Sequence, residues 1–161
     1  MQLLLDASIS QTPPATDDAA ASDILDSVPL VMRVIRKHLR RHRRDLTIPQ
    51  FRALWYIDTG GDGHSLSDVA DFIGLSLPAM SRLIDGLVDH KLVKRRTCEE
   101  DRRHVRLSLT ASGRANLADA RRRAQAHIAK AIKQLTPQQK ASVVDAMRIL
   151  ATTFTPELQQ T

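Results

Sequence analysis

The feature that most constrains the fold is a pair of short amphipathic segments joined by a turn that contains Gly74. Ser65 begins the first segment and Ser76 begins the second. In each segment apolar residues recur at the spacing of one helix face: Leu66, Val69, Ala70 and Ile73, then Met80, Leu83, Ile84 and Leu87. Two short helices joined by such a turn predict a helix-turn-helix.

A basic hairpin is predicted directly after the second helix. Residues 92–97 are strand-like and rich in Lys and Arg, and a polar loop follows at 98–104. Val105, Leu107 and Leu109 then alternate with polar residues, which gives a strand with one apolar face. A helix-turn-helix followed by this hairpin predicts a winged helix, so the expected fold class is all-α with a small β-hairpin wing.

Helical patterns are also expected on both sides of the winged helix. Four regions follow from them: a disordered tail over 1–22, a dimerisation helix over 23–46, the winged helix-turn-helix over 47–110, and two dimerisation helices over 111–161. Pro29 either places the start of the first helix near Ser27 or bends that helix.

The outer helices carry apolar stripes that one winged-helix core cannot cover. The last helix, capped by Thr136 and Gln139, is expected to bury four apolar side chains: Val144, Met147, Ala151 and Phe154. Pairing the stripes of two chains across a two-fold axis would bury both copies, so we expect an obligate homodimer.

Composition narrows the class of function. The 161 residues carry a net charge of +6, which favours a polyanionic partner. Aromatic residues make up only 3%, which disfavours single-strand binding by stacked aromatics. One cysteine cannot form an internal disulfide, and no apolar run is long enough to span a membrane, so a cytoplasmic protein is expected. No catalytic motif or cofactor-binding motif is present, so we expect neither an enzyme nor a cofactor.

The wing and the helix after it resemble the MarR family of bacterial transcriptional regulators. The resemblance rests on the Asp-x-Arg pattern at 101–103, which runs into Leu-x-Leu-Thr-x-x-Gly-Arg at 107–114, and it covers about residues 24–155. It implies a dimeric repressor that binds a pseudo-palindromic double-stranded DNA operator and is released by a small, often phenolic or aromatic, acid. Lys91 departs from the family, whose members often have a glycine there to relieve left-handed backbone strain.

The second helix of the helix-turn-helix is the expected reader of the major groove. Arg82 can donate two hydrogen bonds to a guanine, and Ser81 can bond to a base or a phosphate. Pro78 and Ala79 are small enough to contact a thymine methyl group. The alternative is an ordinary solvated helix face.

In the wing, the resemblance places Arg103 in the minor groove, with Asp101 orienting it. Lys94, Arg96 and Arg102 add positive charge to the same hairpin. A solvated run of charge is the alternative interpretation.

Candidate residues for an effector are Arg36, Trp55 and Tyr56, because a cation and an aromatic ring suit an aromatic carboxylate. Core packing is the alternative for Trp55 and Tyr56. His38 and His42 have a zinc-like spacing but lack a third ligand, so no metal site is expected.

Cys98 is interpreted as an incidental thiol rather than a redox sensor. For the whole chain, the competing class is a winged-helix architectural DNA binder or protein-interaction module that has no effector.

Overall fold

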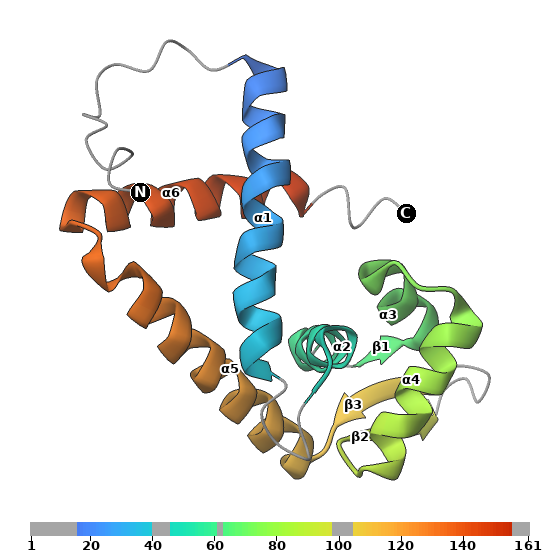
Figure 1. The fold of residues 1–161 in the computed structure, drawn as a ribbon. Coiled ribbons are helices and arrows are strands. Elements are labelled where there is room, and N and C mark those ends of the chain that lie inside the picture. The colour runs from blue at the N-terminus through green and yellow to red at the C-terminus, as the bar shows by residue number, and fades with distance from the viewer. Residues whose placement is uncertain (1–15, 40–45, 61–62, 98–104, 156–161) are drawn as a thin grey trace. The chain divides into compact units, whose positions relative to one another are not determined.

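The computed structural model describes residues 16–39, 46–60, 63–97 and 105–155 (Figure 1). The elements follow in the order α1 (Asp17–Leu39), α2 (Ile48–Thr59), β1 (His64–Ser65), α3 (Leu66–Ile73), α4 (Leu77–Asp89), β2 (Val93–Thr97), β3 (Val105–Leu109), α5 (Ala111–Ala131), a 3-10 turn (Ile132–Gln134) and α6 (Pro137–Phe154). The described chain is mainly helical with one small antiparallel sheet, so the predicted fold class is confirmed. The chain divides into two units, Met1–Val34 and Ile35–Thr161.

Helix α1 begins earlier than its sequence pattern indicated. The backbone carbonyl of Thr16 accepts the N–H of Ala20 at 3.0 Å, and its hydroxyl oxygen accepts the N–H of Ala19 at 3.3 Å. Asp17 and Asp18 occupy the first turn, where the helix dipole favours negative charge. Residues 17–22 are therefore helical, which corrects the predicted tail over 1–22, and residues 1–15 lie outside the described chain. Pro29 lies inside α1 rather than at its start.

The helix-turn-helix follows the predicted boundaries. Ser65 caps α3, since its hydroxyl oxygen accepts the N–H of Asp68 while the Asp68 carboxylate accepts the N–H of Ser65. Gly74 ends α3 in the left-handed region at φ 76°. Ser76 is the N-cap of α4 by its backbone, but its side chain makes no capping hydrogen bond.

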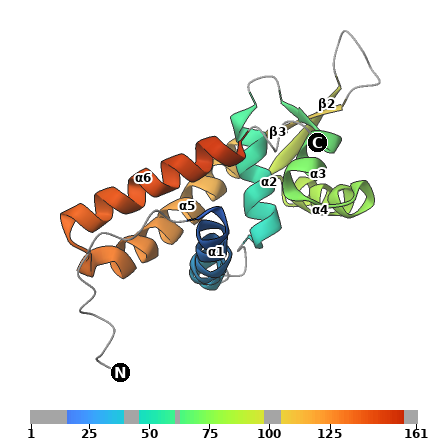
Figure 2. The same ribbon diagram turned by 90° about the horizontal axis from the view of Figure 1, so that it is seen from above.

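The sheet has one strand more than the predicted hairpin. Its strand order is β1-β3-β2, with both pairs antiparallel, and β1 pairs His64 with Leu107. Strands β2 and β3 lie side by side in Figure 2. Leu107 and Leu109 are buried as expected. Val105 is exposed, because it lies at the outer end of β3, and this corrects its predicted place on the apolar face.

The core joins the helix-turn-helix to the sheet and to α5. Met80, Ile84 and Leu87 of α4 are buried in one cluster with Leu107 of β3 and Leu117 of α5. Leu83 packs against the cluster and is half-buried. The inward positions predicted for α4 are therefore confirmed, and the opposite side of this helix is fixed as its outer face.

The last helix, α6, has no buried residue. Its capping box forms as predicted from Thr136 and Gln139, with Pro137 in the first turn. The four side chains predicted to be buried are all exposed: Val144, Met147, Ala151 and Phe154. The prediction is wrong for the single chain, since no other element of the described residues covers this stripe.

Candidate nucleic-acid interface

The outer face of α4 carries the residues predicted to read DNA. Pro78 and Arg82 are exposed, while Ala79 and Ser81 are half-buried. The Arg82 Nε donates a hydrogen bond to the Pro78 carbonyl at 3.3 Å, one turn back along the helix. This bond holds the guanidinium against the first half of α4 and leaves its terminal N–H groups without a hydrogen bond to any described residue. All four residues predicted to read DNA therefore lie in the N-terminal half of α4.

The described part of the wing also presents cations. Lys94 and Arg96 are exposed on β2, and the alternation of a strand puts them on the side of the sheet opposite the buried Val93. Arg96 lies directly across from Arg106 of β3. Like charges in this position destabilise a strand pair, so the arrangement favours a bound polyanion. Asp101, Arg102 and Arg103 lie outside the described residues.

An ion pair between α4 and the wing was not anticipated from the sequence. The Arg95 Nη2 lies 2.6 Å from the Asp85 Oδ1, and both side chains are about half exposed, at 42% and 50%. Arg95 follows Val93 by two residues, so the period of the strand directs it to the face that α4 covers, away from Lys94 and Arg96. The alternation of the strand is the sequence signal from which the direction of Arg95 toward α4 could have been predicted.

The turn after α4 has the geometry that the family pattern implied. The N–H of Leu92 donates to the Leu87 carbonyl at 2.9 Å, and the N–H of Lys91 donates to the Val88 carbonyl at 2.8 Å. These two bonds form a Schellman motif, which needs a left-handed residue, and Lys91 has φ 58°. A lysine thus occupies a conformation that suits glycine, and the fold is retained.

The start of α5 is fastened to the same turn. The Thr110 hydroxyl donates to the Lys91 carbonyl at 2.7 Å and accepts the N–H of Gly113 at 2.9 Å. The Arg114 Nη1 donates to the Leu109 carbonyl at 3.2 Å. The Leu-Thr-x-x-Gly-Arg pattern therefore ties the end of α4, the last wing strand and α5 together.

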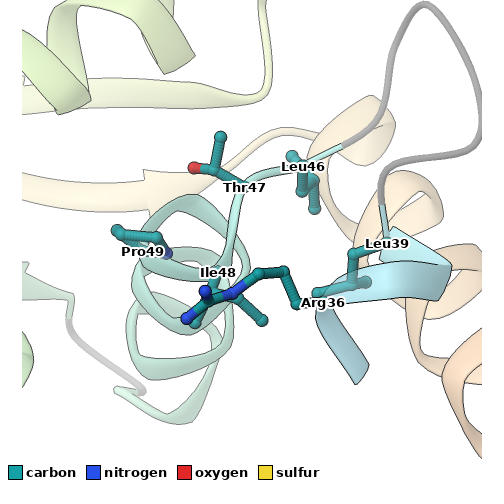
Figure 3. Close-up of a pocket in the computed structure, with 6 residues that line it drawn as sticks. All are labelled: Arg36, Leu39, Leu46, Thr47, Ile48 and Pro49. Carbon is teal, nitrogen blue, oxygen red and sulfur yellow. The ribbon is translucent and has the colours of Figure 1, made fainter. Parts of the chain in front are cut away.

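The three candidate effector residues are not brought together in either of the two pockets that the described residues line. Arg36 lies with Leu39 near the start of α2, in a pocket of about 230 Å³ that Leu46, Thr47, Ile48 and Pro49 complete (Figure 3). Trp55 lines a second pocket of about 320 Å³, with Phe51, Arg52, Phe72 and Arg121. Tyr56 lines neither of these two pockets.

Tyr56 instead belongs to a stack of rings. It lies 4.0 Å from the His64 ring and 4.2 Å from the Phe72 ring, centroid to centroid, and nearly parallel to both. Burial raises the pKa of the Tyr56 phenol, and the carboxylates of Asp68 and Asp71 raise it further. The contacts favour the packing role that was the alternative for this residue.

Arg52 also has an internal role. Its Nη2 donates to the Phe72 carbonyl at 3.0 Å and its Nη1 to the Ile73 carbonyl at 3.5 Å, at the end of α3. Its guanidinium carbon lies 5.2 Å from the centre of the Phe72 ring. Arg52 therefore caps α3 and stacks on an aromatic ring of the Trp55 pocket.

The described residues form neither a metal-binding cluster nor a helix able to cross a membrane. No group of three or more His, Cys, Asp or Glu side chains in that part of the chain could hold a metal ion. His42 and Cys98 lie outside it. None of the described helices is both long and apolar enough to cross a membrane.

Comparison with known proteins agrees with this architecture. A model of the MarR family matches residues 44–104. YfiV of Bacillus subtilis, an uncharacterized HTH-type transcriptional regulator, is 29% identical over 107 residues, which are 66% of this chain and 66% of that relative's own length.

Two solved structures show the same fold. The apo form of wild-type MarR from Escherichia coli aligns with a TM-score of 0.69 at 22% identity, covering 81% of this chain and 95% of that chain. FabT of Streptococcus pneumoniae, solved in complex with DNA, aligns with a TM-score of 0.66 at 22% identity, covering 86% of this chain and 97% of that chain.

MarR-family transcriptional regulators are non-enzymatic DNA-binding proteins, so the predicted class of regulator rather than enzyme is confirmed. The winged helix, the pattern running from the wing into α5, and these matches together show that the chain is similar to the MarR family of transcriptional regulators, with the family model matching its winged-helix part.

Proposed function

We propose that the chain acts as a homodimeric repressor that binds a pseudo-palindromic operator in double-stranded DNA. The observation that carries the proposal is the outer face of α4, where Arg82 and Pro78 are exposed beside the basic strand β2. A helix of this kind fits the major groove, and its N-terminal residues reach base edges. FabT, which shares the fold, is a protein solved with DNA.

The dimer part of the proposal rests on exposed apolar side chains. Val144, Met147 and Phe154 of α6 are 55%, 54% and 43% exposed, and Val143 adds to the apolar surface on this side of the helix. Exposed apolar surface of this extent on one helix is typical of an interface. An isologous pairing of two chains would cover the surface of both copies.

Two symmetry-related α4 helices would enter successive major grooves, so we expect half-sites about 10 base pairs apart. The experiment is selection of bound duplexes from a random library, followed by footprinting on the enriched sequence. A protected pseudo-palindrome with that spacing supports the proposal. Enrichment of a single half-site, or no enrichment, contradicts it.

The effector part of the proposal concerns the Trp55 pocket. Phe51, Trp55 and Phe72 offer aromatic surface, and the exposed Arg121 offers a cation that no described residue engages. This combination suits a small aromatic carboxylate. Such a ligand would release DNA by preferring the chain in its DNA-incompetent arrangement.

Trp55 is the only tryptophan of the chain, so its fluorescence reports on binding at this pocket. Salicylate and related benzoates are the probes, with release of the operator followed by gel shift. A coupling of about 1–3 kcal/mol would weaken operator affinity roughly 5- to 150-fold. Arg121→Ala should weaken ligand binding, while Arg36→Ala, in the other pocket, is the matched control. If Arg36→Ala alone abolishes binding, the effector site is the Arg36 pocket.

The alternative is a winged-helix architectural DNA binder or protein-interaction module without an effector. Equal affinity for selected and random duplexes, with no response to any aromatic acid, would favour it. A cytoplasmic location, where a bacterial operator lies, belongs to the main proposal and is tested with it.

A further inference from the structure

The ion pair between Asp85 and Arg95 sits on the surface that the proposed function presents to DNA. Asp85 follows Pro78 and Arg82 along α4 at the spacing of one helix face. Arg95 reaches it from β2, so the pair joins α4 to the first strand of the wing. A role for this pair in binding rests on the proposed function, because it concerns how this face meets DNA.

A carboxylate at position 85 is unfavourable for two separate reasons. Phosphates repel it, and it lies far from the N-terminal turn of α4, the part of the helix where the dipole would favour negative charge. Asp89 has the same two disadvantages one turn further on. Of the two, only Asp85 pairs with a cation among the described residues.

Stability does not account for the pair. Both side chains are about half exposed, and exposed ion pairs contribute little to the free energy of folding. The contact uses one carboxylate oxygen and one terminal nitrogen, whereas a guanidinium carries five N–H donors. Arg95 therefore keeps donors for a second partner while Asp85 limits the rotamers of its side chain.

We propose that Asp85 is a positioning residue for DNA recognition. It holds the Arg95 guanidinium beside α4, so that the remaining N–H groups of Arg95 bond to a backbone phosphate at the edge of the major groove. Holding the side chain in advance removes part of the ordering cost of binding. Arg95 thereby differs from Lys94 and Arg96, which no described acidic residue orients.

If Asp85 positions Arg95, removing its carboxylate should change DNA affinity in the direction opposite to the one that simple electrostatics predicts. Removing a carboxylate from a DNA-facing helix should strengthen binding, and Asp89→Asn should behave in that way or leave affinity unchanged. Asp85→Asn should instead weaken binding to the enriched duplex by about two- to fivefold, the range that exposed ion pairs give. Asp89→Asn is thus a matched control on the same helix.

The experiment measures fluorescence anisotropy of the enriched duplex and a random duplex with five proteins: wild type, Asp85→Asn, Asp89→Asn, Arg95→Ala and the double variant Asp85→Asn/Arg95→Ala. Arg95→Ala should lower the slope of log affinity against log salt by about 0.9 for each phosphate that the protein no longer neutralises. The double variant should bind no more weakly than Arg95→Ala alone, because Asp85 acts through Arg95. Melting temperatures should match across the set, since both side chains are exposed.

Strengthening by Asp85→Asn equal to that by Asp89→Asn would overturn the inference and leave the proposed function intact. Reductions in affinity from Asp85→Asn and Arg95→Ala that simply add would also overturn it. A wild-type protein that binds neither duplex would instead refute the proposed function, and this inference with it. The wild-type measurement therefore separates the two failures.

Discussion

The first turn of α5 leaves no space for a side chain at Gly113, because a Cβ there would collide with the backbone carbonyl oxygen of Leu92. Leu92 is the residue that completes the turn after α4, and its carbonyl also accepts the N–H of Thr110 at 3.0 Å. The close approach therefore sets how α5 meets the end of α4.

We predict that Gly113→Ala destabilises the protein by about 1–3 kcal/mol, as overpacking against a fixed backbone does. Gly86→Ala, in the interior of α4, is the matched control, since nothing lies within 4 Å of a Cβ added there. That substitution should stabilise by about 0.5–1 kcal/mol, because alanine favours a helix. Urea unfolding measures both, and equal effects would contradict a steric role for Gly113.

A substitution at Lys91 should stabilise the fold, in contrast to Gly113→Ala. Its φ of 58° is left-handed, which strains any residue with a Cβ by about 1–2 kcal/mol. After the greater entropy of glycine in the unfolded chain is subtracted, Lys91→Gly should stabilise the fold by about 0.5–1 kcal/mol. Lys91→Ala removes the same charge but keeps the strain, so it should bring no gain. Stabilisation by both variants in urea unfolding would point to the charge and away from the backbone.

The sequence predicted those features of the fold that are decided within a few residues. The capping box at Thr136 and the turn at Gly74 are local, and each forms as expected. Strand β1 was missed because two residues show no period, and His64 and Ser65 become a strand only by pairing with β3. The early start of α1 depends on Thr16 and the two aspartates after it, in a segment whose composition resembles a disordered tail.

The candidate site, like the fold, has some features that the sequence predicts and others that it does not. The outward positions of α4 follow from helix periodicity, so Arg82 could be placed from the sequence. The period of β2 directs Arg95 toward α4, but the pair joins two elements across a turn, and no local pattern encodes which carboxylate of that helix Arg95 meets. Trp55, Tyr56 and Arg36 were grouped as rings and a cation, but adjacent residues of a helix face different directions, and these three lie in different surroundings.

Arg82 should carry base-specific affinity. We predict that Arg82→Ala weakens binding to the enriched duplex by about 1–3 kcal/mol per half-site and relaxes the preference at one base pair. Arg122→Ala is the matched control, because Arg122 is exposed on α5 and pairs with Asp119 at 3.1 Å. Competition gel shifts against random duplexes measure the difference. An equal reduction on both duplexes would mean that Arg82 contacts only the phosphate backbone.

Tyr56 is the single tyrosine of the chain, so the absorbance of tyrosinate titrates this side chain alone. Because burial raises its pKa, the midpoint in the folded protein should lie above the ordinary value near 10. The folded state holds the phenol proton more tightly than the unfolded state. The stability linked to Tyr56 is therefore intact below about pH 10 and is lost as pH rises through the pKa of the folded protein.

The control for this titration is the same protein in denaturant, where the midpoint should return to about 10. Asp71→Asn should lower the folded midpoint only slightly, since burial is the larger cause of the shift. Identical midpoints with and without denaturant would contradict the partial burial of Tyr56 in the ring stack.

The proposed dimer gives the last prediction. Met147 is 54% exposed and shares one face of α6 with Val144 and Ala151, so Met147→Glu would place a charge in the middle of the expected interface. An unpaired buried carboxylate is costly, and association should therefore fail while each chain keeps its winged-helix core. Ser142→Glu introduces the same charge on the opposite face of the helix and should leave the dimer intact. Sedimentation at micromolar concentration distinguishes the two variants. A wild-type chain that sediments as a folded monomer, or a Ser142→Glu chain that dissociates as readily as Met147→Glu, would remove α6 from the interface.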